Sequence, residues 1–382
     1  MRKYLNYGMV GGDLDAFIGS VHRTAAAFDG RAVLTAGCFS RDGQKNKACG
    51  DFYRVDSQRI YDSYETMAEA EGQRDDGIDF VVIVTPNNTH YPVACAFLKQ
   101  GIHVLCEKPL CFTAAEAKAL KALAQAAGVY FGVNYSYSGT NMVKEARELV
   151  RSGVIGRIIN VNAEYLQEYL VDDVSSGDPK MVKLSSWRKD PDIAGISNCV
   201  GDIGSHIEHT VAYITGLRPK RVAAVLDDFG QPLDLNANIL VEFDNGAHGV
   251  FSSSQVCVGH MNGFVVRIFG TEGALEWHQE KPDELYVTMK GRPTQIYNRG
   301  MGYVSARSAQ LTRLPSGHPE GLFAAFANIY QSYISAILKK VNGEAPGPDD
   351  LDFPTIDDGI AGVKFIHACV ESSRNDSAWV EV

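Results

Sequence analysis

Several features are missing from this 382-residue sequence, and each absence excludes a class of protein. No run of about 18 consecutive apolar residues occurs, so no segment is expected to span a membrane. The N-terminal residues reach Gly8 without an apolar signal core, and we expect them to begin a strand rather than a secretion signal. Acidic residues outnumber basic ones, and the net charge of −10 argues against nucleic acid or an acidic membrane surface as the main partner.

Cysteine is present, but without the spacing of a zinc or redox motif. The eight cysteines are scattered, with no Cys-x-x-Cys and no zinc-type pairing with histidine. We therefore expect no metal site. We interpret most of the cysteines as small buried residues of a protein in the reducing cytoplasm.

The length and the periodicity of the chain predict two domains. The chain is long for a single core, and 45% hydrophobic with 21% charged residues is an ordinary globular balance. Residues 1–133 alternate short apolar runs with helical patterns, which predicts a doubly wound parallel sheet with helices on both faces. The predicted strands of this part are Tyr7–Val10, Val33–Phe39, Phe80–Val84, Ile102–Cys106 and Val129–Val133.

Residues 134–382 are patterned differently, as a substrate-binding and oligomerisation domain. Alternating runs separated by turns such as Asp244-Asn245-Gly246 predict an open, mostly antiparallel sheet. Helices are expected at Met142–Arg151, Asp202–Thr215, Glu320–Leu338 and Gly359–Ser372. Apolar alternation on a sheet face that helices leave uncovered favours pairing with a second subunit, so we expect a homodimer or homotetramer.

The first turn, from Gly11 to Gly19, has the position of a dinucleotide-binding loop because a strand precedes it and a helix follows. If Gly11 is the first glycine of G-x-G-x-x-G/A, Asp13 takes the second position and Ala16 the third. The second glycine lets the backbone approach the pyrophosphate, so a carboxylate there adds a like charge. At a separation of about 4 Å, the repulsion between two such charges costs about 1 kcal/mol in water and about 4 kcal/mol at an effective dielectric constant of about 20. Either Asp13 and Asp15 turn to solvent, or nucleotide affinity is weakened.

Two further loops are expected at the carboxyl edge of the parallel sheet. In Ser40-Arg41-Asp42, an acid would accept the ribose 2′-hydroxyl, whereas Ser40 and Arg41 could hold a 2′-phosphate, so NAD and NADP are both open. Thr85 to His90, with Pro86 and two asparagines, predicts a turn where a nicotinamide ribose would lie, or else a simple connecting loop.

The most distinctive stretch is Glu107-Lys108-Pro109, which ends an apolar run. Pro109 fixes its own φ and biases Lys108 away from helix, so the lysine has a defined direction at a strand end, where open parallel sheets bind ligands. An ordinary solvated lysine is the alternative. Thr113 with Glu116 predicts a capping box that opens the next helix.

Asp202 and His206 form a second candidate pair. Four residues apart at a predicted helix start, they share a face, which suits a carboxylate that orients an imidazole acting as a base. The alternative is that Asp202 only interacts favourably with the helix dipole and that His206 has no catalytic role.

These motifs together resemble the Gfo/Idh/MocA oxidoreductases, a family that joins a Rossmann domain to an open antiparallel-sheet domain. The resemblance rests on Glu107-Lys108-Pro109, on Thr85-Pro86-Asn87, on Gly201-Asp202-Ile203-Gly204-Ser205-His206 and on Trp187-Arg188-Lys189-Asp190-Pro191. It covers nearly the whole chain. Other stretches, such as Gly317-His318-Pro319-Glu320-Gly321, look like the branch that includes levoglucosan and inositol-type dehydrogenases. The departure from that branch is the first loop, where Asp13 and Asp15 replace glycines.

The resemblance implies an NAD(P)-dependent dehydrogenase that reversibly oxidises a secondary ring hydroxyl of a sugar, glycoside or inositol. It assigns catalysis to three residues. The Lys108 ammonium would stabilise the developing alkoxide, and burial can lower the pKa of this lysine so that it joins proton transfer. His206 would be the base, and Asp202 would be its partner. Expected cofactor residues are Gly11, Gly12, Asp13, Phe17, Ile18, Ser40, Arg41, Thr85, Pro86, Asn87, His90, Glu107 and Lys108. Expected substrate residues are Lys108, Tyr137, Gln167, Trp187, Arg188, Asp202, His206 and His318.

Two other functions stay open. A relative with tightly bound nicotinamide could use transient oxidation to cleave a glycosidic bond. A sugar-binding relative could have lost its nucleotide, given Asp13 and Asp15, although the intact Lys108, Asp202 and His206 set argues against this.

Overall fold

The computed structural model describes residues 1–175 and 186–382, and these residues pack as two units. The first unit comprises Met1–Gly139 and Leu322–Ile360, and the second comprises Thr140–Gly321 and Ala361–Val382. The sequence predicted a single division after residue 133. The packing differs from this in placing residues 322–360 with the N-terminal part, because an apolar helix from this stretch covers the parallel sheet.

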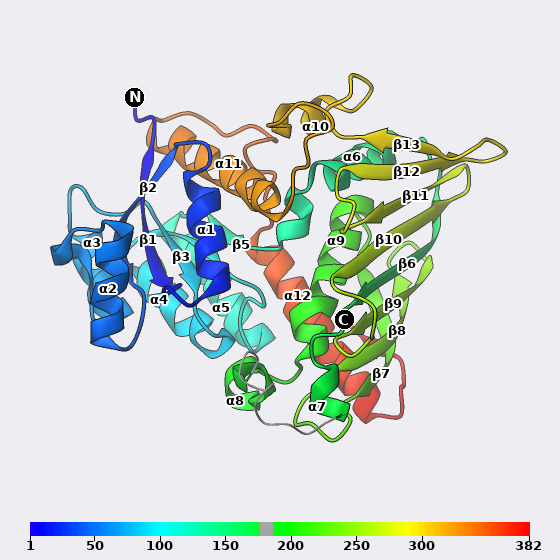
Figure 1. The fold of residues 1–382 in the computed structure, drawn as a ribbon, viewed down its shortest axis with the longest axis horizontal. Helices are drawn as coiled ribbons and strands as arrows, with labels where there is room; N and C mark the ends of the chain where they lie inside the picture. Colours follow the sequence, from blue (N-terminus) through cyan, green and yellow to red (C-terminus); the bar gives the residue numbers. More distant parts are fainter. Residues whose placement is uncertain (176–185) are drawn as a thin grey trace. The chain divides into compact units, whose positions relative to one another are not determined.

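The first unit is built on a five-stranded parallel sheet in the order β2-β1-β3-β4-β5. The predicted doubly wound architecture is therefore confirmed (Figure 1). Its strands are β1 (Leu5–Gly11), β2 (Ala32–Cys38), β3 (Phe80–Val84), β4 (His103–Cys106) and β5 (Phe131–Val133). Its helices are α1 (Phe17–Ala27), α2 (Gly43–Tyr53), α3 (Tyr64–Gly72), α4 (His90–Lys99), α5 (Ala114–Ala127) and α11 (Leu322–Val341).

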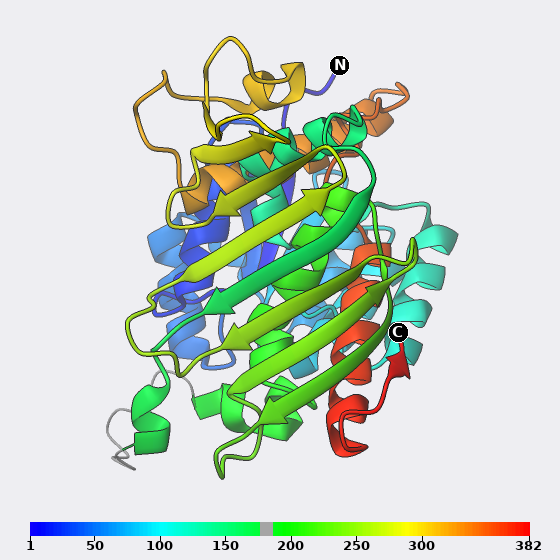
Figure 2. The ribbon, with the colours of Figure 1, turned by 90° about the vertical axis from the view of Figure 1, so that its right-hand side faces the viewer.

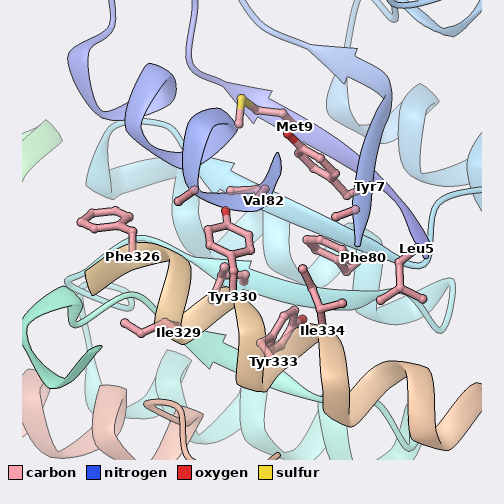
Figure 3. Close-up of a cluster of buried hydrophobic side chains, with 14 of the residues drawn as sticks. Leu5, Tyr7, Met9, Phe80, Val82, Phe326, Ile329, Tyr330, Tyr333 and Ile334 are labelled. Atoms are coloured by element: carbon pink, nitrogen blue, oxygen red, sulfur yellow. The ribbon is translucent and has the colours of Figure 1, made fainter. Parts of the chain in front are cut away.

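The core of this unit explains why α11 belongs to it. Figure 3 shows Tyr330 and Tyr333 of α11 directed at side chains of β1 and β3. The Phe80 ring lies 5.6 Å from that of Tyr333 in an edge-to-face contact and 5.3 Å from that of Tyr7, on which it stacks. Aromatic side chains of this size bury about 150–250 Å² each, so this cluster is a main source of hydrophobic stabilisation for the unit.

The second unit contains a nine-stranded sheet in the order β13-β12-β11-β10-β6-β9-β8-β7-β14. Neighbouring strands are antiparallel except β6 and β9, so the predicted mostly antiparallel sheet is confirmed. Its strands are β6 (Ile158–Leu166), β7 (Pro219–Asp227), β8 (Asn236–Phe243), β9 (His248–Ser254), β10 (Gly263–Gly270), β11 (Gly273–His278), β12 (Glu284–Met289), β13 (Gln295–Asn298) and β14 (Val380–Glu381). Its helices are α6 (Asn141–Arg151), α7 (Val171–Ser175), α8 (Pro191–Ala194), α9 (Ser205–Thr215) and α10 (Ala306–Leu311), and α12 (Ile356–Arg374) runs into it from the first unit.

The two faces of the nine-stranded sheet are covered differently. Helices α6, α9 and the later part of α12 lie on one face, and Figure 2 looks onto the other, which carries no helix in front of the strands. Side chains on that open face include Val225, Leu240 and Val250, which are 47%, 51% and 45% exposed. Leu240 and Val250 are direct cross-strand partners.

Two local features differ from the sequence prediction. Helix α2 was not predicted; it begins after Asp42, whose carboxylate accepts hydrogen bonds from the Gln44 and Lys45 amides. The predicted helix from Asp202 instead begins as a π-helical turn, η6 (Val200–Gly204), and becomes α-helical at Ser205. By contrast, β3 has the predicted bounds, and Thr113 and Glu116 form the predicted capping box that opens α5.

All eight cysteines lie in the described residues, and none is in a disulfide. Five of them are buried, as the sequence predicted for most: Cys49, Cys106, Cys111, Cys199 and Cys369. None of the helices in residues 1–175 and 186–382 is both long and apolar enough to cross a membrane.

Candidate functional site

The loop after β1 is shaped by glycines at positions where no side chain fits. Gly11 and Gly12 have φ of 81° and 73°, a region that glycine adopts without penalty. A Cβ on Gly19 of α1 would lie 2.4 Å from the Gly12 Cα. Gly19 is thus the residue that lets the helix pack closely on the loop, a role that the sequence pattern had given to Ala16.

Side chains from α1 and α2 hold this loop in place. The Gly12 carbonyl accepts hydrogen bonds from Arg23 Nη1 at 3.0 Å and from the Tyr53 hydroxyl at 3.3 Å. The Arg23 guanidinium also lies 3.8 Å from the centre of the Tyr53 ring. Ala16, the N-cap of α1, makes no side-chain capping bond. The first amides of this helix are therefore placed to face an anion at its N-terminus.

The two acids of the loop form an ion-paired group with Lys45 of α2. Lys45 Nζ lies 2.8 Å from Asp13 Oδ2 and 2.7 Å from Asp15 Oδ2. The hydrogen bonds that the Lys45 ammonium donates to these carboxylates raise the pKa of Lys45. The sequence predicted either solvent-facing acids or weakened affinity, and the structure shows a third arrangement in which one ammonium compensates both. Of the other residues expected here, Phe17 is 70% exposed and Ile18 is half-buried.

The loop after β2 places Ser40 and Arg41 at the carboxyl edge of the sheet, as predicted. Ser40 is half-buried, and Arg41 is exposed. The Asp42 carboxylate is engaged at the N-terminus of α2, where it accepts from the Gln44 amide at 2.9 Å and from the Lys45 amide at 3.0 Å. Its first role is therefore that of a helix cap.

The loop after β3 is held by a buried histidine. His90 has its Nδ1 2.8 Å from the Pro109 carbonyl and its Nε2 2.9 Å from the Thr85 carbonyl. Burial lowers the pKa of His90 more than these carbonyls raise it, so the neutral ring donates to one of them at a time. His90 was predicted to bind a cofactor. In the structure its ring joins the β3 loop to the turn after Lys108. Thr85, Pro86 and Asn87 lie at the predicted edge.

Glu107 and Lys108 follow β4 directly, so the lysine lies at a strand end as predicted. Glu107 is buried, and its Oε1 accepts from His22 Nε2 at 2.8 Å and from Asn134 Nδ2 at 2.5 Å. The Lys108 amide donates to its Oε2 at 3.2 Å. Burial is the largest single influence on the pKa of Glu107 and raises it. The hydrogen bond and charge of His22, the charge of Lys108 and the hydrogen bond from Asn134 together outweigh burial and lower the pKa to about 2.

The network continues into α11. His22 Nδ1 lies 2.7 Å from the Tyr330 hydroxyl, and the His22 side chain is wholly buried. A chain of side chains thus runs from α11 through α1 to the residue beside Lys108. Because three elements fix Glu107, the backbone that presents Lys108 is tightly held. Tyr137, predicted to line the substrate pocket, is buried in the 3₁₀ turn η3 (Ser136–Gly139) of the same unit.

In the second unit, Asp202 lies in the π-helical turn and His206 in the first turn of α9. π-turns occur often at functional sites. Asp202 Oδ2 accepts from Gln255 Nε2 at 3.1 Å and lies 3.6 Å from Arg188 Nε. His206 is buried, with its ring 6.4 Å from that of Tyr165.

The segment that enters the π-turn is fixed by a buried carboxylate, Asp234. It accepts from the Asn198 amide at 2.9 Å, from the Val200 amide at 3.0 Å and from the Ser197 hydroxyl at 3.0 Å. Burial raises the pKa of Asp234 despite these bonds. Asp202 is therefore presented from a rigidly held backbone.

Polar side chains gather around Asp202. Gln255 is fully buried; it donates to the Tyr169 hydroxyl at 2.9 Å and to Asp202, and it accepts from Asn198 Nδ2 at 2.7 Å. Burial, and then the Asp202 charge, raise the pKa of Tyr169. Trp187 lies against Arg188, with 4.5 Å between the guanidinium carbon and the ring centre. The structure therefore joins the predicted residues Arg188, Trp187 and Asp202 in one cluster.

Gln167 belongs to a neighbouring pair of contacts. Its Nε2 donates to Asn262 Oδ1 at 2.9 Å, and the Tyr165 hydroxyl donates to the same oxygen at 2.6 Å. Since Tyr165 also lies near His206, this pair connects Gln167 to the His206 surroundings within the second unit.

His318 lies apart from these contacts. Its side chain is exposed on the segment between α10 and α11, and its carbonyl accepts from Arg299. Among the interactions of residues 1–175 and 186–382, none joins its imidazole to the Asp202 cluster. Arg299 is buried and also binds Asp283 and Glu320, which anchors the segment.

Sequence reasoning missed several residues of these sites. Lys45, Asn134 and Gln255 were not singled out, and His22, Arg23 and Asn262 were given no role in the site. Each acts through a partner distant in sequence, so no local pattern marks it. Gly19 carried a signal, since a glycine inside a predicted helix suggests close backbone packing.

Comparisons with known proteins agree with this architecture. Residues 5–135 match the family model described as "Oxidoreductase family, NAD-binding Rossmann fold", and residues 143–276 match the "GFO/IDH/MocA C-terminal domain". The uncharacterized oxidoreductase YfiI of Bacillus subtilis is 38% identical over 100% of this chain and 98% of its own. Levoglucosan dehydrogenase of Pseudarthrobacter phenanthrenivorans is 31% identical over 56% of this chain and 58% of its own.

A solved structure is also similar over the whole chain. The inositol dehydrogenase homolog of Azotobacter vinelandii, complexed with NAD⁺, has a TM-score of 0.93 and 35% identity, covering 100% of this chain and 98% of its own. The loop glycines, which leave no room for a Cβ, and the anion-facing start of α1 fit an NAD-binding Rossmann unit. The protein is therefore an oxidoreductase with an NAD-binding domain, and it belongs to the Gfo/Idh/MocA family.

Proposed function

We propose that this oxidoreductase is an NAD(P)-dependent dehydrogenase that reversibly oxidises a secondary ring hydroxyl of a sugar, glycoside or inositol. The observation that carries the proposal is Lys108, which follows β4 at the carboxyl edge of the Rossmann sheet beside a buried, ionised Glu107. Relatives described as an inositol dehydrogenase homolog and a levoglucosan dehydrogenase support the substrate class.

In the proposed reaction, Lys108 donates a hydrogen bond to the substrate oxygen and stabilises negative charge as the hydroxyl loses its proton. His206 takes that proton as general base, and Asp202 orients and charges the imidazole. When bound, the nicotinamide cofactor accepts the hydride from the carbinol carbon. A positioned base of this kind contributes roughly 10²–10⁴-fold to the rate.

The proposed specificity for a polyhydroxylated ring rests on the groups around Asp202. Arg188 and Gln167 offer guanidinium and amide donors, and Trp187 offers an apolar ring face. Several hydroxyls on one ring need several donors and acceptors at once, which such a cluster supplies. We include Tyr137 and His318 in the proposed substrate contacts by resemblance to the family.

The direct test is turnover of a panel of inositols and pyranosides with NAD⁺ and with NADP⁺. We expect at least one polyol to yield reduced cofactor in equal amount to oxidised product, and the variant K108A to lose this activity while still binding NADH. The exposed Lys118 provides a matched control, since K118A removes the same charge from α5 and should keep full activity.

Product analysis separates the proposal from its nearest rival. Free aglycone from a glycoside without net reduced cofactor would favour cleavage by transient oxidation. Activity of K108A equal to that of K118A would contradict both.

We also propose that the protein forms a homodimer or homotetramer through the open face of the nine-stranded sheet. The apolar side chains Val225, Leu240 and Val250 occupy neighbouring strands there, beside ion pairs such as Arg221 with Glu242. Light scattering should give a multiple of the 41.6 kDa chain mass, and L240E should shift it towards one chain. A mass of 41.6 kDa for the unmodified protein would contradict this.

The eight unpaired cysteines support the further proposal of a reducing, cytoplasmic location. The test is to lyse cells in the presence of an alkylating reagent and to count the alkylated cysteines of the denatured protein. All eight should carry the reagent, because each was a free thiol in the cell. Paired cysteines would argue for an oxidising compartment.

A further inference from the structure

The loop that should receive the pyrophosphate carries two carboxylates, and one of them, Asp13, takes the position of the second glycine in the dinucleotide-binding pattern. Asp13 and Asp15 lie between β1 and α1, just before the amides that face an anion at the helix start. Two acids at this position oppose a ligand that is itself negatively charged.

We propose that Lys45 is a positioning residue of the dinucleotide site, which holds the Asp13 and Asp15 carboxylates in an ion-paired cluster and so offsets their repulsion of the pyrophosphate. This inference concerns cofactor binding and does not depend on which substrate the enzyme oxidises. It adds to the site a residue from α2, a helix that follows the second strand rather than the first.

The geometry of Asp13 supports the proposal. Its Oδ1 accepts from the Asp15 amide at 3.0 Å, its Oδ2 pairs with Lys45, and its carbonyl accepts from the Ala16 amide at 3.0 Å. Both carboxylate oxygens are therefore engaged, Oδ1 within the loop and Oδ2 with Lys45 of α2. The side chain is 23% exposed, whereas that of Asp15 is 81% exposed, so Asp13 is the acid held against the loop and Asp15 the one that reaches out to the same ammonium.

The position of Lys45 is itself fixed by its helix. Its amide donates to the Asp42 carboxylate at the N-terminus of α2, and its side chain is 36% exposed. Asp42 therefore anchors the turn from which Lys45 reaches the loop. The three charges sum to −1, whereas loss of the lysine would leave −2 beside the ligand.

The experiment is a set of NADH-binding measurements by fluorescence at low ionic strength on purified full-length variants. We expect K45M to raise the Kd about tenfold, because two uncompensated carboxylates then face the pyrophosphate. The triple variant K45M/D13N/D15N should return to within about threefold of the unmodified protein, since asparagine keeps the Asp13 oxygen that accepts from residue 15 but removes both charges. K45R, which keeps the ion pairs, should bind NADH nearly as well as the unmodified protein.

Lys47, an exposed lysine of the same helix, provides the matched control, and K47M should leave the Kd unchanged. The effect of K45M should shrink as the salt concentration rises from about 0.05 M to about 0.5 M, since the repulsion is screened, whereas a folding defect would not respond in this way. If K45M binds NADH as well as K47M does, Lys45 has no such role. If the triple variant stays as weak as K45M, Lys45 acts on the phosphate directly and the proposed cluster is wrong.

Discussion

The buried pair of His22 and Glu107 allows a sharp prediction about the first unit. Replacing His22 with leucine removes a 2.8 Å hydrogen bond to Glu107 and leaves its carboxylate, which is ionised at neutral pH, with Asn134 and the Lys108 amide as its hydrogen-bond donors. A hydrogen bond to a buried charged group contributes about 1.5–3 kcal/mol. Since two other donors to Glu107 survive, we expect H22L to lower the free energy of unfolding by about 2 kcal/mol.

The pKa of Glu107 reports the combined effect of burial, His22, Lys108 and Asn134 on this carboxylate, and it sets how the stability depends on pH. It falls from 4.5 to about 2 on folding, and each pKa unit is worth about 1.36 kcal/mol, so the ionised native state gains on the order of 3 kcal/mol. Because the folded pKa is the lower one, this stability is fully present above about pH 4.5 and is lost as the pH falls towards about 2. The difference in unfolding free energy between the unmodified protein and E107Q should therefore be constant from about pH 5 to 7 and shrink below that range.

The assay is urea unfolding followed by circular dichroism and tyrosine fluorescence for the unmodified protein, H22L, E107Q and the double variant H22L/E107Q. The double variant should lose less than the sum of the two single variants, because each single change already breaks the shared bond. A value for H22L within about 0.5 kcal/mol of the unmodified protein, or strict additivity in the double variant, would refute the reasoning.

Three further predictions concern other parts of the two sites. G19A should lower the free energy of unfolding by about 2 kcal/mol and weaken NADH binding, because the added Cβ would lie 2.4 Å from the Gly12 Cα. The control G43A, at the open start of α2, should be neutral or slightly stabilising, and equal thermal midpoints for the two variants would contradict this. D234N should lower the free energy of unfolding by about 2 kcal/mol in urea, because the new amide points an N–H at a group that now donates to Asp234. An unchanged urea midpoint would show that these three hydrogen bonds contribute little. Q255L should lower kcat/KM for the polyol about tenfold with an unchanged Kd for NADH, because Gln255 holds Asp202; a change in NADH affinity alone would place its effect elsewhere.

Much of the first unit could be predicted because its signals are local. The strand Phe80–Val84 is buried along its whole length, and the helix Ala114–Ala127 is opened by a capping box, so a run of apolar residues and a four-residue motif were enough. Glu107-Lys108-Pro109 was placed at a strand end for the same reason. Helix α2 was missed because its sequence carries no apolar stripe, and its start depends on one capping bond from Asp42.

The parts that could not be predicted depend on distant partners. His90 resembled a loop residue at a ligand edge, yet its ring joins two backbone carbonyls that are close only after folding. The interpretation of Asp13 and Asp15 as a threat to nucleotide binding left out Lys45, which lies more than two elements further along the chain. The α11 helix was assigned to the second half by sequence order, while its aromatic face packs on β1 and β3.

The central claim is that Lys108 takes part in hydride removal from a secondary alcohol. The most direct measurement follows deuterium from the carbinol carbon of an accepted inositol or pyranoside into reduced cofactor, in the unmodified protein and in K108M saturated with NAD⁺. The account predicts deuterated NADH from the unmodified protein and a loss of at least about 10²-fold in the transfer rate with K108M. Transfer at the unmodified rate by K108M, with NAD⁺ bound equally in both, would contradict it.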